Sequence, residues 1–379
     1  MSTFLNALLV AVLSLAMGVA GAASAPVPPP PDLPAKGYVL LDAFSGRILV
    51  GHNDTERLEP ASLTKLMSAY AVFQALKDGK LKLNQPVPIS QHAWKAEGSR
   101  TFVDVGTQVP VEILIQGMIV QSGNDATIAL AEAVGGSETT FAALMNQYGE
   151  RLGLRGTHWT NSTGLPDPQH YTTARDIGIL SAALVREFPE YYKWYSQRSF
   201  TYNNIKQENR NGLLERDPTV DGIKTGHTDA AGYCLASSAL RDGMRLVSVV
   251  MGTASPKARE DASASLLGYG FNFYETKRLF APGTQVGSTS VFKVSEPVNV
   301  VVHDNLYATA ARGELAAATT QLVLNSRLIA PLAANAPIGR LRVSLGQTLL
   351  GDVPVYPASA VETGSFYRRA VDTVRLWFN

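Results

Sequence analysis

The spacing of apolar residues changes along this chain, and each change predicts a different kind of element. From residue 37, GYVLLDAFSGRILVGHN has apolar runs on both sides of Ser45-Gly46 and predicts a β-hairpin. A second hairpin is predicted over residues 232–253, where YCLASSAL and MRLVSVVMG flank Asp242-Gly243, a favoured two-residue turn. Between the hairpins, helical spacing of apolar residues predicts helices over residues 63–76, 111–120, 126–134, 141–152 and 174–188.

Two short strands and one long helix complete this region. The strands are predicted over residues 200–203 and 222–225, and the helix over residues 257–275. Strands at both ends of the region, with helices between them, are typical of an antiparallel sheet flanked by helices. The pattern therefore predicts one α+β domain over residues 37–281.

The pattern changes again on either side of this domain. Short alternating strands such as VNVVVHD, LRVSLG and DVPVYPA predict a separate small β-rich domain over residues 282–362, which carries no recognisable catalytic constellation. Residues 26–36, PVPPPPDLPAK, are expected to form an extended proline-rich linker without a packed core of its own.

The N-terminus predicts export. Residues 1–25 follow the plan of a secretory signal peptide, with an apolar stretch from about Leu8 to Ala20 and small residues after it. Cleavage after Ala25 or after Ala22 stays open, since Pro26 is an awkward neighbour for the first site. A single membrane anchor is the alternative, but the apolar run is shorter than the ~20 residues that a spanning helix needs.

The C-terminus, residues 363–379, has the pattern of an amphipathic helix. Arginines lie largely on the face opposite the apolar one, and the segment is too short and too charged to cross a bilayer. We expect it to lie on the membrane surface, with packing on the β-rich domain as the alternative. The apolar face comprises Phe366, Ala370, Val374, Trp377 and Phe378.

Composition narrows the function further. The net charge is +1 over 379 residues and no long basic run is present, so nucleic-acid binding is not expected. Cys234 is the only cysteine, which excludes an internal disulfide, and its strand-like surroundings predict a buried packing residue. The chain has neither an H-E-x-x-H motif nor a Cys/His cluster, so we expect no metal and no cofactor.

A serine and a lysine stand three positions apart in PASLTKLM, at the start of an apolar helix. At this spacing Ser62 and Lys65 share a helix face and would touch. A serine hydroxyl becomes a nucleophile when a neighbouring base accepts its proton, and a lysine can be that base if its pKa is lowered. The pair alone also fits a helix-capping serine followed by a first-turn lysine, so it needs further support.

Two tripeptides supply that support. Ser122-Gly123-Asn124 lies in a predicted loop between two apolar helices, where functional residues are often presented. Lys224-Thr225-Gly226 lies on a predicted strand, where the glycine would let a ligand approach the backbone closely.

With S-x-x-K, S-G-N and K-T-G in this order, the chain resembles the penicillin-recognising serine acyl-transferases. It is more closely similar to the low-molecular-mass penicillin-binding proteins that are D-alanyl-D-alanine carboxypeptidases, over about residues 37–379. The stretches that carry this resemblance are PASLTKLM, MIVQSGNDA, NRNGLL, VDGIKTGHTDAAGY and LLGYGFNFYE, followed by a β domain. The resemblance implies a β-lactamase/transpeptidase-like catalytic domain.

The resemblance also implies roles for the residues that match the family motifs. Ser62 would be the acylated nucleophile and Lys65 its general base. Ser122 would relay a proton toward the leaving amine, and Asn124 would hold Lys65 and the substrate amide.

A second set of residues would bind the substrate. The carboxylate of the substrate would be bound by Lys224 and Thr225, beside Gly226. Arg210, in NRNG, would assist there, although fewer residues than expected separate it from Lys224. Backbone N–H groups of Ser62 and His227 would form the oxyanion hole.

The implied activity is a serine-type D-Ala-D-Ala carboxypeptidase that trims peptidoglycan pentapeptides and is acylated by β-lactams. It would act at the periplasmic face of the cytoplasmic membrane.

DD-endopeptidase activity on cross-linked peptides is the nearest alternative. A β-lactamase of class A would carry E-x-x-L-N before K-T-G, and Glu187, Glu190, Glu208 and Glu215 all lack the following Leu-Asn. A non-catalytic cell-wall-binding scaffold would not need a nucleophile and a base together.

Overall fold

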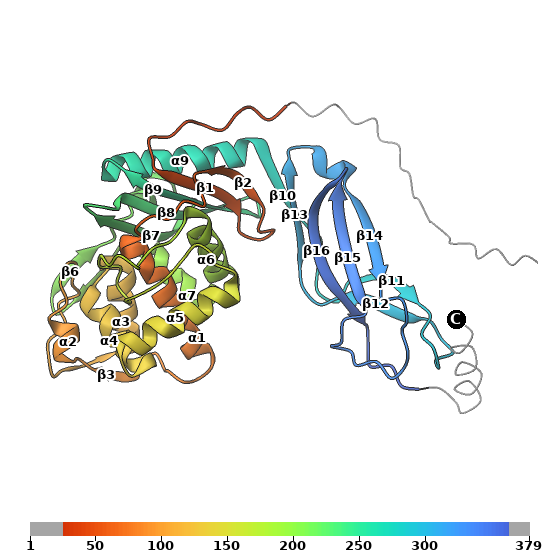
Figure 1. Cartoon of the computed structure of the whole chain (residues 1–379), viewed down its shortest axis with the longest axis horizontal. Coiled ribbons are helices and arrows are strands. Elements are labelled where there is room, and N and C mark those ends of the chain that lie inside the picture. The colour runs from red at the N-terminus through yellow and green to blue at the C-terminus, as the bar shows by residue number, and fades with distance from the viewer. Residues whose placement is uncertain (1–25, 364–379) are drawn as a thin grey trace, which may run out of the picture.

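A computed structural model describes residues 26–363 and contains two bodies, each built around a five-stranded sheet (Figure 1). The predicted signal peptide, residues 1–25, lies outside the described residues, as do residues 364–379 of the predicted C-terminal helix. The larger body has helices on both faces of its sheet, and the smaller one is built from strands. The prediction of an α+β fold followed by an all-β part is confirmed.

The sheet of the larger body is antiparallel, with the order β2-β1-β9-β8-β7. Asp242 and Gly243 join β8 to β9 with φ angles of 48° and 80°, as the predicted two-residue turn requires. Strand β7 forms one edge of the sheet and passes beside the turn that carries Ser62. The bounds are β1 Gly37–Asp42, β2 Ile48–His52, β7 Val220–Thr228, β8 Gly232–Arg241 and β9 Met244–Thr253.

Side chains from the two faces of this sheet enter two different cores because successive strand residues point to opposite faces. In β1, Val39 and Leu41 belong to the core under the helical layer, whereas Tyr38 and Leu40 belong to the core under α9 (Pro256–Phe273). Strands that are buried on both faces read as nearly continuous apolar runs, as β1 does.

The helical layer surrounds α1, which is apolar on all sides and is therefore buried by its neighbours. Figure 1 shows these helices on the sheet face opposite α9. The layer is formed by α1 Lys65–Lys77, α3 Val111–Gln116, α4 Asn124–Gly135, α5 Glu138–Leu152 and α6 Ala174–Glu187. All five predicted helices in this region are present, but the one predicted over residues 111–120 changes to a π-helical turn at Gly117–Gln121.

The strand predicted over residues 200–203 is present as β5. Other short elements, such as α2 and β6, had no clear signal in the sequence because their runs are too brief for a periodicity to register. Their bounds are α2 Gln91–Trp94, α7 Pro189–Tyr192, α8 Leu213–Arg216, β3 Pro86–Pro88, β4 Gln108–Pro110, β5 Ser199–Tyr202 and β6 Ile205–Glu208, together with 3-10 turns at Ala61–Thr64, Lys193–Ser196 and Glu314–Ala317.

The proline-rich segment 26–36 has no helix or strand, but it packs on the core under α9. Val27 and Leu33 contact that core, and the hydroxyl of Tyr269 donates to the carbonyl of Pro28 at 2.8 Å. Prolines lack the N–H that a sheet requires, so the segment is held by side-chain contacts and single hydrogen bonds instead.

The smaller body is an antiparallel sheet with the order β11-β12-β16-β15-β14, beside the pair β10–β13. Its core is formed by small and branched aliphatic residues such as Val300, Val302 and Val343. The bounds are β10 Tyr274–Phe280, β11 Gln285–Thr289, β12 Val298–Val302, β13 Leu306–Ala311, β14 Thr319–Leu324, β15 Gly339–Leu345 and β16 Thr348–Pro357.

The two bodies meet where the β1–β2 turn contacts β10 and β13. The hydroxyls of Ser45 and Thr309 are 2.6 Å apart, and the hydroxyl of Thr276 donates to Asp42 at 2.7 Å. The rings of Phe44 and Tyr307 stack with centroids 4.9 Å apart. The junction is therefore mostly polar, with a single stacked pair.

We predict that Leu66→Ala, in the first turns of α1, lowers the free energy of unfolding by about 2–5 kcal/mol, because it leaves a cavity where no part of the side chain is exposed. Leu240→Ala in β8 is the control. It removes the same atoms from a residue that is 42% exposed and should cost about 0.5 kcal/mol or less. Urea unfolding followed by tryptophan fluorescence measures both, and equal losses would contradict the assignment of α1 to the core.

Candidate active site

The candidate site begins where the chain enters α1. Ser62 lies in the 3-10 turn Ala61–Thr64, and Lys65 is the first residue of α1. Ala61 has a φ of 46°, a conformation that residues other than glycine rarely adopt and that is often found at functional sites. The predicted contact is present, with Lys65 Nζ 3.1 Å from Ser62 Oγ.

The Lys65 amine has two further partners. Its Nζ donates to Asn124 Oδ1 at 2.6 Å and to the carbonyl oxygen of Thr163 at 2.7 Å. A neutral amine has two N–H groups and one lone pair. With Asn124 and Thr163 accepting the two N–H groups, the lone pair is left to face the hydroxyl of Ser62, which is the orientation that a base requires.

The surroundings of Lys65 favour its neutral form. Burial, together with the positive charge of Arg210, lowers its pKa from 10.5 to about 7, while Asp125 and Glu138 act in the opposite direction. The side chain is 1% exposed. A substantial fraction of Lys65 is therefore unprotonated near neutral pH, as a general base should be.

Ser122 and Asn124 lie where the chain enters α4. Ser122 follows the π-helical turn Gly117–Gln121 and has a φ of 65°, and π-helical turns are often found at functional sites. Its buried Oγ has no hydrogen-bond partner among the described residues. Asn124 begins α4 and donates from Nδ2 to the carbonyl of Glu97 at 2.6 Å, which orients the oxygen of its side chain toward Lys65.

Strand β7 brings the third motif to the same place. Lys224 is buried, and its Nζ donates to the carbonyl of Thr225 at 3.0 Å. Burial places the pKa of Lys224 well below its ordinary value, and the charges of Lys65 and Arg210 lower it further. Three cationic groups thus lie close enough to influence one another, an arrangement that an anionic ligand would stabilise.

Gly226 permits the close approach of β7 to the nucleophile turn. A Cβ at this position would lie 3.0 Å from the carbonyl of Pro60 and 3.2 Å from the backbone nitrogen of Leu63. The next residue, His227, is stacked on Tyr233 with ring centroids 4.0 Å apart. The stacking holds the backbone of β7 beside the cavity.

A cavity of about 430 Å³ lies between these elements. It reaches residues from each predicted motif, including Arg210, which the sequence had placed with least certainty. The lining residues are Ser62, Gly98, Ser99, Ser122, Asn124, Thr163, Gly164, Leu165, Arg210, Thr225, Gly226, His227 and Thr228. Lys65 and Lys224 are buried beside this lining, so all nine predicted site residues are gathered here.

Residues 161–165 complete the cavity, and the sequence had not predicted their part in it. Asn161 Oδ1 accepts hydrogen bonds from the backbone N–H groups of Thr163 and Gly164, which fixes the loop. The only signal in the sequence was a run of turn-forming residues, NSTG, which predicts a loop but not its contact with Lys65. The wall at Gly98 and Ser99 was missed for the same reason.

No group of three or more metal-ligating side chains occurs within residues 26–363. In the same part of the chain, no helix combines the length and the apolar character that crossing a membrane requires.

The fold and the site together define a serine acyl-transferase of the penicillin-recognising class. Two family models match the chain, one described as D-alanyl-D-alanine carboxypeptidase over residues 22–255 and the other as the C-terminal domain of penicillin-binding protein 5 over residues 274–363. The chain belongs to the D-alanyl-D-alanine carboxypeptidase family, and the resemblance inferred from its motifs is confirmed.

Relatives match over most of their length. The chain is 40% identical to the D-alanyl-D-alanine carboxypeptidase DacA of Escherichia coli K12 over 362 residues, which covers 93% of this chain and 90% of that protein. It is 46% identical over 268 residues to DacA of Haemophilus influenzae, covering 69% of this chain and 68% of that protein. The crystal structure of penicillin-binding protein 5 from Haemophilus influenzae superposes with a TM-score of 0.80 at 40% identity, covering 88% of this chain and 99% of that one.

We predict that Gly164→Ala disrupts the site, because a Cβ there would lie 1.8 Å from the carbonyl oxygen of Ala61, and Gly164 itself has a φ of +88°. Gly136→Ala is the matched control, since Gly136 has a φ of +74° with nothing within 4 Å of a Cβ. The control isolates the backbone strain of about 1–2 kcal/mol. Urea unfolding should show a larger loss of stability for Gly164→Ala, and equal losses would contradict the close approach.

Proposed function

We propose that this chain is a serine D-Ala-D-Ala carboxypeptidase that removes the terminal D-alanine from peptidoglycan stem pentapeptides. The observation that carries the proposal is the buried Lys65 amine, directed at Ser62 Oγ in a cavity whose other wall holds cationic side chains. A peptide with a free C-terminal carboxylate meets both needs, because it presents a carbonyl to a nucleophile and a negative charge to the cations.

Acylation follows from this arrangement. Ser62 Oγ attacks the carbonyl carbon of the penultimate D-alanine while its proton passes to the Lys65 amine. The oxyanion that forms is stabilised by the backbone N–H groups of Ser62 and His227. The C–N bond then breaks, and the leaving amine of the terminal D-alanine takes a proton that Lys65 supplies through Ser122. The product is an ester on Ser62.

Deacylation returns the enzyme to its starting state. A water molecule attacks the ester carbonyl, with Lys65 accepting its proton, and the Ser62 oxygen leaves and is reprotonated. A β-lactam would enter by the same first step, because its amide carbonyl and carboxylate match those of the substrate. Its ring opening would leave a covalent adduct on Ser62.

Substrate binding is assigned to the cationic wall. Lys224, Thr225 and Arg210 would bind the terminal carboxylate, with Asn124 holding the peptide amide and Gly226 keeping β7 close to the substrate backbone. The buried position of Lys224 supports this role, since a desolvated cation gains more from a carboxylate than an exposed one does.

The organisation of the whole chain fits this activity. We assign catalysis to residues 37–281 and place the linker 26–36 before it and the small β-rich domain 282–362 after it. Residues 1–25 would direct export, and residues 363–379 would attach the enzyme to the periplasmic face of the cytoplasmic membrane. An extracytoplasmic location suits a family that acts on peptides of the cell wall.

Ser62→Ala should abolish release of D-alanine from a pentapeptide ending in D-Ala-D-Ala, because no other nucleophile is activated in the cavity. Mass spectrometry of the peptide products measures it, and a tetrapeptide is expected from the unaltered enzyme. Ser196→Ala, in an exposed turn, is the control. A covalent penicillin adduct on Ser62→Ala protein would overturn the assignment, and cleavage of cross-linked peptides alone would favour an endopeptidase.

Truncation after Thr363 should release the processed enzyme from the membrane while activity on a soluble pentapeptide is retained. Each large apolar side chain buried in the interface contributes roughly 1.5–3 kcal/mol, and each arginine near anionic lipid about 1 kcal/mol. Membrane fractionation of both forms measures the effect. Unchanged membrane association, with the signal peptide shown to be removed, would rule out the anchor.

A further inference from the structure

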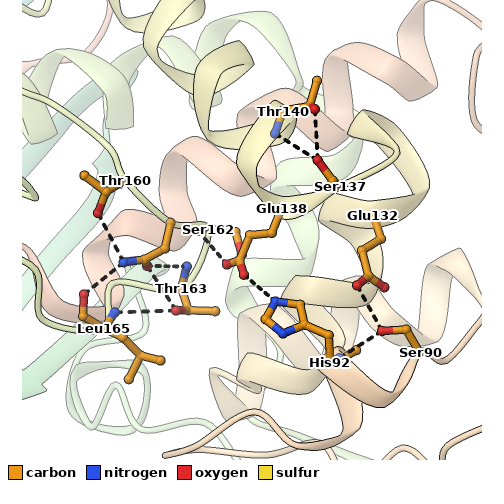
Figure 2. Close-up of polar contacts among 12 residues, drawn as sticks. Ser90, His92, Glu132, Ser137, Glu138, Thr140, Thr160, Ser162, Thr163 and Leu165 are labelled. Atoms are coloured by element: carbon orange, nitrogen blue, oxygen red, sulfur yellow. Dashed lines mark hydrogen bonds and ion pairs between the residues drawn. The ribbon is translucent and has the colours of Figure 1, made fainter.

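Glu138 is a carboxylate that joins two walls of the cavity without lining the cavity itself. It is the first residue of α5, and its side chain is 16% exposed. Oε1 accepts hydrogen bonds from the backbone nitrogen of Ser162 at 3.0 Å and from Ser162 Oγ at 2.6 Å. Oε2 pairs with His92 Nε2 at 2.8 Å, as Figure 2 shows.

The contact between Glu138 and Ser162 is connected to the proposed base, Lys65, through the neighbouring residue Thr163. Ser162 and Thr163 are neighbours in the loop 161–165, and both of their carbonyl oxygens bind α1. The Thr163 carbonyl accepts from Lys65 Nζ at 2.7 Å, and the Ser162 carbonyl accepts from Ser68 Oγ at 2.6 Å. Glu138 therefore holds the residue directly before Thr163, whose carbonyl orients Lys65.

The contact between Glu138 and His92 is connected to the Lys65 amine through a second set of residues. His92 lies on α2, and the chain that follows α2 supplies Glu97, Gly98 and Ser99 to the cavity region. The carbonyl of Glu97 accepts from Asn124 Nδ2, and Asn124 Oδ1 accepts from Lys65 Nζ. Both oxygens that bind the N–H groups of Lys65 thus belong to segments connected to Glu138.

The charge of Glu138 acts on Lys65 as well. Burial raises the pKa of Glu138, but hydrogen bonds from Ser162 and His92 outweigh it and hold the pKa below its ordinary value. The carboxylate is therefore ionised at neutral pH. Among the charged groups that face Lys65, Glu138 and Asp125 raise its pKa, whereas Arg210 lowers it and Lys224 is a further neighbouring cation.

We propose that Glu138 is a positioning residue for the general base: through Ser162 and His92 it fixes the two acceptors that direct the Lys65 lone pair at Ser62. The inference rests on the proposed role of Lys65. It gives Glu138 two separable functions, since its oxygens anchor the Ser162 loop and its charge influences the Lys65 amine.

Two substitutions separate these functions. Glu138→Gln keeps an oxygen that can accept from Ser162 but removes the charge, whereas Glu138→Ala removes both. Glu132→Ala is the matched control, because Glu132 of the adjacent helix α4 accepts its hydrogen bond from Ser90 Oγ at 2.9 Å rather than from the Ser162 loop. Figure 2 shows both carboxylates. The rate of acylation by a labelled penicillin is measured from pH 5 to 9 on the full chain, per titrated active site.

The expected pH profiles of acylation follow from how each substitution changes the charge near Lys65 and the position of its amine. Acylation should rise with pH as Lys65 loses its proton, with its midpoint near pH 7 in the unaltered enzyme. Removing the negative charge lowers the pKa of Lys65, so both Glu138 variants should shift this rise to lower pH. Glu138→Ala should also lower the high-pH plateau by about tenfold or more, because a misplaced base slows the reaction steeply. Glu132→Ala, at a residue that contacts α2 but not the Ser162 loop, should leave the midpoint unchanged and lower the plateau less than Glu138→Ala does.

Three outcomes would overturn the inference. A Glu138→Ala plateau equal to that of Glu132→Ala excludes positioning, and an unshifted pH profile for Glu138→Gln excludes the effect of charge. A plateau loss in Glu138→Gln as large as in Glu138→Ala excludes the anchoring of the loop.

If Glu138→Ala does not fold, Ser162→Ala replaces it. This variant keeps the hydrogen bond from the backbone N–H of residue 162 to Glu138, so it should lower the plateau less. Absence of any adduct in the unaltered enzyme would instead refute the proposed function.

Discussion

The burial of one lysine amine is the constraint on which the rest of the site depends. Lys65 is 1% exposed and lies at the start of a helix that is itself enclosed. A buried ammonium is costly unless it is hydrogen-bonded, and two oxygens from distant parts of the chain supply those bonds. The helical layer, the loop 161–165 and the first turn of α4 must all be in place before Lys65 can be neutral, oriented and close to Ser62.

The need to hold these elements in place around Lys65 also explains why the larger body has two cores. The core under the helical layer fixes α1 and α4 relative to each other, and the core under α9 supports the other face of the sheet. Strand β7 then lies so close to the Ser62 turn that a Cβ at Gly226 would be crowded, and a Cβ at Gly164 would overlap the Ala61 carbonyl. Close packing of backbone segments, rather than any single strong bond, holds the cations and the nucleophile at working distance.

The site concentrates positive charge in a region with little solvent. Besides burial, the charge of Arg210 lowers the pKa of both Lys65 and Lys224, and the charge of Lys65 also lowers the pKa of Lys224. Close positive charges repel one another, so the site is electrostatically unfavourable by itself. A bound carboxylate would relieve this repulsion between the cations. Under the proposed function, recognition of the substrate and activation of the base are thus coupled through one set of charges.

The sequence by itself determined the elements that have a long periodic signal, the α+β class, and the residues in the three motifs, because these depend on local spacing and residue type. It did not determine where residues 161–165 or the carboxylate of Glu138 would lie, since NSTG predicts a turn and nothing more. The hydrogen bond from Lys65 to Thr163 spans 98 residues of chain, and it forms only when α1, α4 and α5 pack together. Ser62 and Lys65 could be paired from their spacing. The oxygens that orient the Lys65 amine were decided by the tertiary structure, because hydrogen-bond partners distant in sequence leave no periodic pattern.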